Sequence, residues 1–238
     1  MRKYLVLFTQ EFSRLISYRV NLIVSYFASF ITPVLMLIAL LNTKSTTGVT
    51  VSSLIPYYVI VSQTFVLVKS EIDQKISDMA RAGDINNFLL KPMPFFRYML
   101  FSDLAEKIAR LTYCLPILLL TVVFYGQVSP GQYYSPGTIL LFILGFPFCY
   151  FLSFILAYLV GLSSFWIDEV WAFRNVRWVL IQLFGGVILP YTLFPDKFLQ
   201  VIKYTPFPYS VSLPARILQG TATPIEFLWA FVWSLILR

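Results

Sequence analysis

The sequence contains no histidine, only two cysteines, and charged side chains at only 12% of its 238 positions. The absence of histidine excludes a Ser-His-Asp constellation and a histidine-based zinc site. Cys114 and Cys149 both lie in apolar runs, so no disulfide framework is expected. None of the ten glycines is followed by lysine, which excludes a G-x-x-x-x-G-K-[ST] phosphate loop. We therefore expect no catalytic site, metal or cofactor in this chain, and any energy source must come from outside it.

The low charge is accompanied by a hydrophobic content of 58%. Soluble domains have about a quarter of their residues charged, so a water-soluble globule is excluded. Six apolar segments are long enough to cross or nearly cross a bilayer, at residues 20–41, 54–70, 111–126, 138–165, 178–194 and 225–238. In lipid, every backbone polar group must be satisfied within its own segment. The sequence therefore predicts an all-α membrane protein with six transmembrane helices.

The net charge of +7 is distributed unevenly along the chain. Fourteen of the 18 basic residues fall in the N-terminal tail, the 69–110 loop, the segment around 174–177 and the last position. Because positive charge is retained on the cytoplasmic side, both termini are predicted to lie in the cytoplasm of a multi-pass cell-membrane protein. The basic residues form no stripe with stacking aromatic side chains, so a nucleic-acid partner is not expected.

Residues 1–19 have the pattern of an amphipathic helix. Leu5, Phe8 and Phe12 recur at helical spacing, opposite Gln10 and Arg14. This pattern favours an interfacial helix lying on the inner leaflet, in contact with membrane lipids. A cap packed on the loops of the same chain is the alternative.

The longest polar stretch, residues 69–110, is predicted to be a cytoplasmic loop. Within it, Gly83 suits the left-handed position that ends a helix, Asp84 can cap the next helix, and Pro92 stops that helix. The short helix between them carries Ile85, Phe88 and Leu89 on one face. Such an apolar face must find a groove, either in its own protein or in a partner, and the pattern leaves both open.

Residues 190–224 contain six of the fourteen prolines, so no long helix is expected there. The residues between these prolines are too apolar for a solvated loop. Short helices that dip into the outer leaflet, or that close a cavity from outside, fit this composition. Gly185 and Gly186 permit a kink in the fifth segment, although simple helix packing through small residues explains them equally well.

The sixth apolar segment is short. At 1.5 Å per residue, residues 225–238 would span only about 21 Å, less than the hydrocarbon core. We therefore expect that the end of the sixth helix is missing from this chain.

Two stretches resemble the membrane subunits of type-2 ABC exporters. The first, 81–92 (RAGDINNFLLKP), is similar to the family's Gly-x-Leu-Asp-x-Leu-Leu-x-Arg-Pro loop, with Ile85 for leucine and Lys91 for arginine. The second, 185–195 (GGVILPYTLFP), followed by 205–208 and 214–220, is similar to the region that joins the family's fifth and sixth helices.

This resemblance implies a single transmembrane permease domain over 1–238 that is not itself an enzyme. Its partners would be a second permease subunit, as a homodimer or heterodimer, and ABC ATPase subunits that bind ATP and Mg. The cytoplasmic loop would dock on the ATPase through Gly83, Asp84, Ile85, Phe88, Leu89, Leu90, Lys91 and Pro92. The extracellular gate would include Gly185, Gly186, Pro190, Phe194 and Pro195.

Two other functional classes remain as alternatives. An integral-membrane enzyme acting on lipids would need a convergent polar site, and the sequence shows none. A channel or an ion-gradient-driven carrier usually needs ionisable residues near the membrane midplane. Here the charged residues lie in loops or near segment ends, which favours the ATP-driven exporter.

Overall fold

The computed structural model describes residues 2–17, 19–28, 30–31, 34–35, 38, 51–90, 93–128, 136–167, 169–218, 222 and 224–237. All regular secondary structure in these ranges is helical, in agreement with the predicted all-α class. The helices are α1 (Arg2–Ser17), α2 (Arg19–Ala28), α4 (Val51–Val68), α5 (Ile72–Ala82), α6 (Asp84–Leu89), α7 (Phe95–Val128), α8 (Pro136–Leu162), α9 (Trp171–Phe184), α10 (Asp196–Ile202), α11 (Phe207–Leu218) and α12 (Pro224–Ile236), with 3-10 turns at Ser163–Phe165 and Tyr191–Leu193.

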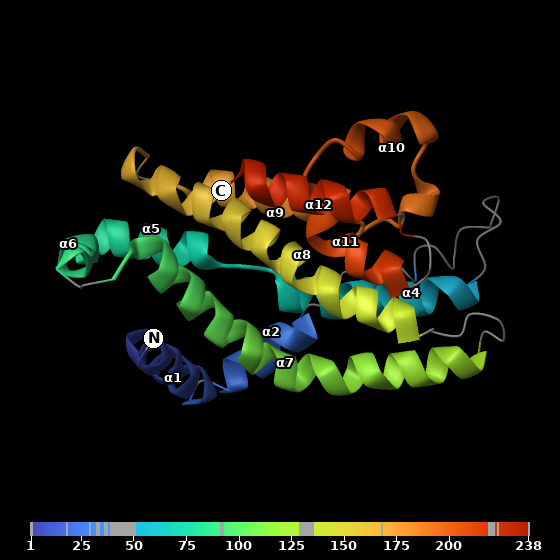
Figure 1. The fold of residues 1–238 in the computed structure, drawn as a ribbon, viewed down its shortest axis with the longest axis horizontal. Helices are drawn as coiled ribbons and strands as arrows, with labels where there is room; N and C mark the ends of the chain where they lie inside the picture. The colour runs from blue at the N-terminus through green and yellow to red at the C-terminus, as the bar shows by residue number, and fades with distance from the viewer. Residues whose placement is uncertain are drawn as a thin grey trace.

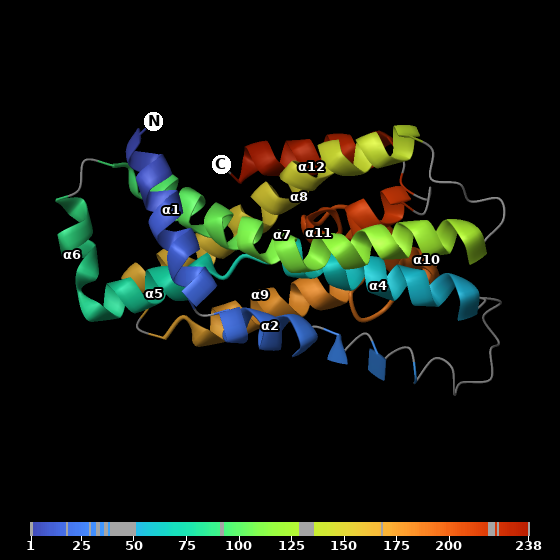
Figure 2. The ribbon, with the colours of Figure 1, turned by 90° about the horizontal axis from the view of Figure 1, so that it is seen from below.

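The helices form an elongated bundle (Figure 1). Helices α1, α5 and α6 gather at one end, which we call the α6 end, and α10 lies toward the other, the α10 end. Figure 2 shows the same division from below. Both chain termini lie in the half of the molecule nearer the α6 end (Figure 1). The side of the membrane on which the termini and the 69–110 loop lie stays a prediction.

Several predicted boundaries were wrong. Helix α7 is 34 residues long and joins the end of the predicted loop to the third apolar segment without a break. The fifth segment was predicted over 178–194, but α9 begins at Trp171 and ends at Phe184. It ends there because Gly186 has a φ of +74°, outside the helical region, and Pro190 follows. Of the first segment, 20–41, the structure describes α2 and a few later residues only.

One helix in the described part of the chain, Ile139–Phe165, is both long and apolar enough to cross a membrane. Residues Ile225–Ile236 form a shorter apolar helix. The described residues thus provide one clear span by length and composition, so the predicted count of six remains a prediction.

The proline-rich region forms short helices, as its composition predicts, and one of them lies in the centre of the bundle. Tyr209, Val211 and Leu213 of α11 are almost completely buried. They pack in the core with residues of α4, α8 and α12, although Pro214 lies within the helix. Helix α10 lies at the far end of the bundle, outside this core (Figure 1).

Candidate functional site

The turn between α5 and α6 is made by Gly83. It has a φ of +74° and ends α5, with its backbone N–H directed at carbonyl oxygens of the last helical turn, as the sequence predicted. Asp84 does not cap α6 as expected. Helix α6 begins at Asp84 itself and Gly83 occupies the N-cap position. The exposed Asp84 carboxylate therefore lies in the first turn, near the positive end of the helix dipole.

The apolar face of α6 packs on its own chain. Phe88 is only 2% exposed, and its ring centroid lies 5.1 Å from that of Phe95 and 4.9 Å from that of Tyr98. Of the two environments that the pattern leaves open for this face, the structure places Phe88 in its own chain, against α7, and contact of the docking set with an ATPase stays a prediction. Leu90, at the end of α6, is 85% exposed, so its apolar side chain is turned outward. Ile85 is half-buried.

Three members of the predicted docking set are not described in full. Lys91 and Pro92 lie outside the described residues, and so does the side chain of Leu89.

Helix α5 is held to α9 by a buried ion pair. Arg177 on α9 donates a hydrogen bond of 2.8 Å from Nη2 to Oδ2 of Asp73 on α5. The same nitrogen donates to the backbone carbonyl of Ser70, at 3.2 Å. Both charged side chains are buried. A buried charge is costly unless it is paired, so this contact fixes the position of α5 against α9.

The polar contacts continue from Ser70 to α7. The Ser70 hydroxyl donates to Oδ1 of Asp103 at 2.9 Å, and the Lys107 ammonium lies 3.3 Å from the same oxygen. Burial raises the pKa of Asp103, which Lys107 counteracts only in part. These buried polar groups thus connect α9, α5 and α7 at the α6 end.

A second charged cluster lies at the loop between α4 and α5. Glu71 pairs with Lys69 at 2.5 Å and lies 3.8 Å from Arg110 on α7. Burial alone would raise the pKa of Glu71, but these two cations outweigh it and lower the pKa to about 2. Burial opposes ionisation of Glu106 in the same way, and Lys107 and Arg110 lower its pKa.

Helix α1 is attached to the same region. Lys75 on α5 donates to Oε1 of Glu11 and to the hydroxyl of Ser102, each at 2.5 Å. Tyr4 stacks on Phe101 with ring centroids 4.8 Å apart. Leu5 nevertheless remains exposed on the other side of α1. The helix therefore packs on α5 and α7 and still presents apolar surface, and its contact with membrane lipids stays a prediction.

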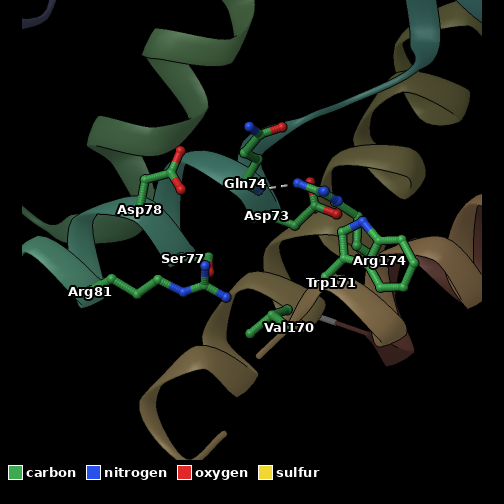
Figure 3. A pocket seen from close by; sticks show the side chains of 8 residues that line it. All are labelled: Asp73, Gln74, Ser77, Asp78, Arg81, Val170, Trp171 and Arg174. Atoms are coloured by element: carbon green, nitrogen blue, oxygen red, sulfur yellow. Dashed lines mark hydrogen bonds between the residues drawn. The ribbon is translucent and has the colours of Figure 1, made fainter. Parts of the chain in front are cut away.

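A cavity of about 150 Å³ opens beside α5, between it and the first turn of α9. Figure 3 shows Arg81 extending from α5 on one side, with Arg174 and Trp171 on the other. The lining consists of Asp73, Gln74, Ser77, Asp78, Arg81, Val170, Trp171 and Arg174. We call this cavity the α5–α9 notch.

The residues predicted to form a gate follow α9. Gly185 ends α9 and Gly186 adopts the left-handed conformation. Tyr57 on α4 donates a hydrogen bond of 2.7 Å to the carbonyl of Gly186. The two glycines are therefore a helix terminus held against α4, and not a kink within a helix.

The other predicted gate residues border short elements. Pro190 is buried and precedes the Tyr191–Leu193 turn, and Pro195 is exposed and precedes α10. Phe194 stacks on Phe198 with ring centroids 5.4 Å apart. These contacts give the region an ordered aromatic packing.

An ion pair connects this region to α12. Arg216 on α11 lies over the ring of Tyr191, 5.3 Å from its centroid, and donates to Glu226 on α12. Glu226 lies in the first turn of α12, and its carboxylate accepts a hydrogen bond from Arg216. The pair therefore joins α12 to α11.

Comparison with known proteins identifies the family. A family model described as ABC-2 family transporter protein matches residues 22–238. The chain belongs to this family. No curated protein and no solved structure matches it. ABC-2 permeases are membrane proteins, are generally non-catalytic, and normally work with an ABC ATPase partner.

The sequence of this ABC-2 permease does not reveal the buried Asp73–Arg177 pair. The two residues are 104 residues apart, and the sequence pattern uses Arg177 only as a charge that sets orientation. The available signal was the position of both charges beside apolar segments, where an unpaired charge is unfavourable. That signal predicts a partner for each charge but does not identify it.

Proposed function

We propose that this chain is the membrane-spanning subunit of an ATP-driven ABC exporter. It would couple ATP hydrolysis by a separate ATPase subunit, which holds the ATP and Mg, to export of a substrate. The observation that carries the proposal is the buried Asp73–Arg177 pair, which joins α5, beside the family-like 81–92 segment, to α9. Membership of the ABC-2 family supports the permease role.

In this proposal the ATPase contacts α6 and the exposed Leu90. Force applied there passes to α7 through Phe88, whose ring packs on Phe95 and Tyr98. It passes to α9 through α5 and the Asp73–Arg177 pair. Helix α9 leads directly to Gly185 and Gly186, where Tyr57 holds the predicted gate segment. A displacement of α6 would therefore reach the proposed gate through packed helices.

The proposed membrane arrangement places the α6 end in the cytoplasm and the α10 end outside, with six spans and both termini cytoplasmic. The distribution of basic residues and the position of both termini near the α6 end support this orientation (Figure 1). A second permease subunit, identical or different, would complete the transport pathway.

The experiment that tests this function is affinity purification of the tagged chain from its native membrane in mild detergent, followed by assay of ATP hydrolysis. We expect a phosphate-loop ATPase to co-purify with the wild-type chain. Leu90→Asp should abolish co-purification, because it places a charge on the exposed apolar contact. Leu5→Asp, the same change at an exposed leucine of α1, should leave it intact.

Recovery of the chain alone, with no ATP hydrolysis, would contradict the proposal. Transport by the purified chain in ATP-free vesicles would point to a carrier or channel. Turnover of a lipid by the isolated chain would point to an integral-membrane enzyme.

A further inference from the structure

The α5–α9 notch lies next to the end of the apolar helix that is long enough to cross a membrane. The clear span Ile139–Phe165 finishes five residues before Val170, which lines the notch. Helix α5 crosses the last turn of this span closely. A Cβ atom added to Gly161 would lie 3.0 Å from Cα of Asp73, another lining residue. The notch is therefore at the boundary between the hydrocarbon core and the polar region.

Exposed aromatic side chains occur at the notch, where Trp171 lines it, and in the chain segments next to its lining residues. Trp166 is 82% exposed and Trp171 is 63% exposed, and Phe165 and Phe173 are also exposed. Tryptophan prefers the headgroup level of a bilayer, where its ring is among apolar groups and its N–H can reach water. This corner of the molecule has the composition of a surface in contact with lipid headgroups.

The charged side chains that line the notch are two arginines and two aspartates. Arg81 reaches in from α5 and Arg174 from α9, on opposite sides of the cavity (Figure 3). The Asp73 carboxylate is already neutralised by Arg177, which leaves the exposed Asp78 as the other acidic lining group. Arg174 forms no ion pair within the part of the chain that the structure describes. Two guanidinium groups on opposite walls suit the oxygens of a phosphate.

The first turn of α9 adds to this preference. Val170 occupies the N-cap position and provides no side-chain hydrogen bond to the turn. The helix N-terminus therefore presents backbone N–H groups beside Arg174. The cavity volume of about 150 Å³ is similar to that of an engineered protein cavity that holds benzene, and it is large enough for a phosphate group.

We propose that the α5–α9 notch binds the phosphate of an anionic phospholipid headgroup, between Arg81 and Arg174. The exposed tryptophans lie against the glycerol and upper acyl region of the same lipid. Because Asp73 lines the notch and pairs with Arg177, the bound lipid stabilises the contact between α5 and α9. This site requires the membrane but not the ATPase, so it can be tested independently of the exporter proposal.

The test uses the full chain purified in neutral detergent, with thermal unfolding measured in mixed micelles. Dioleoyl phosphatidylglycerol should raise Tm by about 3 °C or more beyond the effect of dioleoyl phosphatidylcholine. In the Arg81→Ala/Arg174→Ala variant at least half of this difference should be lost. Arg97→Ala, which removes an exposed arginine of α7, is the matched control and should keep the full difference.

Native mass spectrometry provides the second measurement, and it does not depend on the stability of the variants. It should detect phosphatidylglycerol on the wild-type chain and on Arg97→Ala, with a several-fold lower bound fraction on the double variant. Equal Tm shifts from the two lipids, or an unchanged shift in the double variant, would overturn the proposal. An equal shift from inorganic phosphate would show a small-anion site. If the double variant loses the co-purified ATPase but keeps the Tm difference between the two lipids, the two arginines contact a protein. Either of these last two results overturns the lipid assignment.

Discussion

The carboxylate of Asp73 and the guanidinium of Arg177 lie 2.8 Å apart in a buried position between α5 and α9, although 104 residues separate them in sequence. One helix leads to the turn that resembles the ATPase-docking loop of type-2 exporters, and the other leads to the proposed gate. In the proposed mechanism, motion at α6 would reach α9 through this contact, so the contact would have to be rigid.

Breaking this pair should destabilise the chain strongly. Asp73→Asn leaves the buried Arg177 charge uncompensated, which costs about 3–5 kcal/mol of unfolding free energy in comparable buried pairs. The double variant Asp73→Leu/Arg177→Met removes both charges and should recover most of that loss. Thermal or denaturant unfolding of the purified chain in detergent measures both effects. Asp78→Asn, an exposed position on the same helix, should change stability by less than about 0.5 kcal/mol.

The double variant also separates stability from coupling. If it folds and binds the ATPase but no longer links hydrolysis to transport, the pair has a role in transmission. If transport by the double variant equals that of wild type, the pair is structural only.

Close packing of α8 against α5 depends on Gly161. A Cβ atom there would lie 2.8 Å from Cδ1 of Ile76 and 3.0 Å from the α5 backbone at Asp73. Gly161→Ala should therefore destabilise the chain by about 1–3 kcal/mol, as overpacking does in other proteins. The control is Gly145→Ala on the same helix, where the added atom meets only side-chain atoms of Ile217 and Phe227, at 3.1 Å. An equal or larger loss of Tm in Gly145→Ala would contradict this account.

The end of α9 should be sensitive to any side chain at Gly186. Its φ of +74° is unfavourable for other residues by about 1–2 kcal/mol, and an added Cβ would lie 2.7 Å from the Tyr57 hydroxyl. Gly186→Ala should lower stability by at least that amount. Tyr57→Phe removes only the hydrogen bond to the Gly186 carbonyl and should cost about 0.5–1.5 kcal/mol. The unfolding midpoints of Gly186→Ala and Tyr57→Phe can be compared directly. A larger loss of stability in Tyr57→Phe would show that the backbone conformation of Gly186 is not what mainly restricts this position.

Glu71 should contribute to the acid sensitivity of the protein. Lys69 and Arg110 lower its pKa from 4.5 to about 2 against the effect of burial, so the folded state favours the ionised form. Its stabilising contribution is complete above about pH 4.5 and is lost as the pH falls toward 2. Wild type should exceed Glu71→Gln in Tm at pH 7, and the difference should shrink between pH 4.5 and 3. A difference that is independent of pH would show that the charge of Glu71 is not responsible.

The sequence alone determined the helical class, the membrane environment and the family. These follow from composition and from local patterns: few charges, long apolar runs, and the 81–92 and 185–195 stretches. Gly83 was also predicted correctly, since a left-handed helix end depends on the residue itself. Such features are local, so they can be read without knowing which segments meet in space.

The tertiary structure alone decided which side chains face one another. Phe88 has the same apolar character whether it faces a partner or α7, and only the fold shows that α7 covers it. Asp73 and Arg177 could each have paired with a nearer charge, and Glu226 could have capped its own helix. Their actual partners depend on the packing of α5, α9 and α11, because ion pairs and ring contacts act over a few ångströms between segments far apart in the chain.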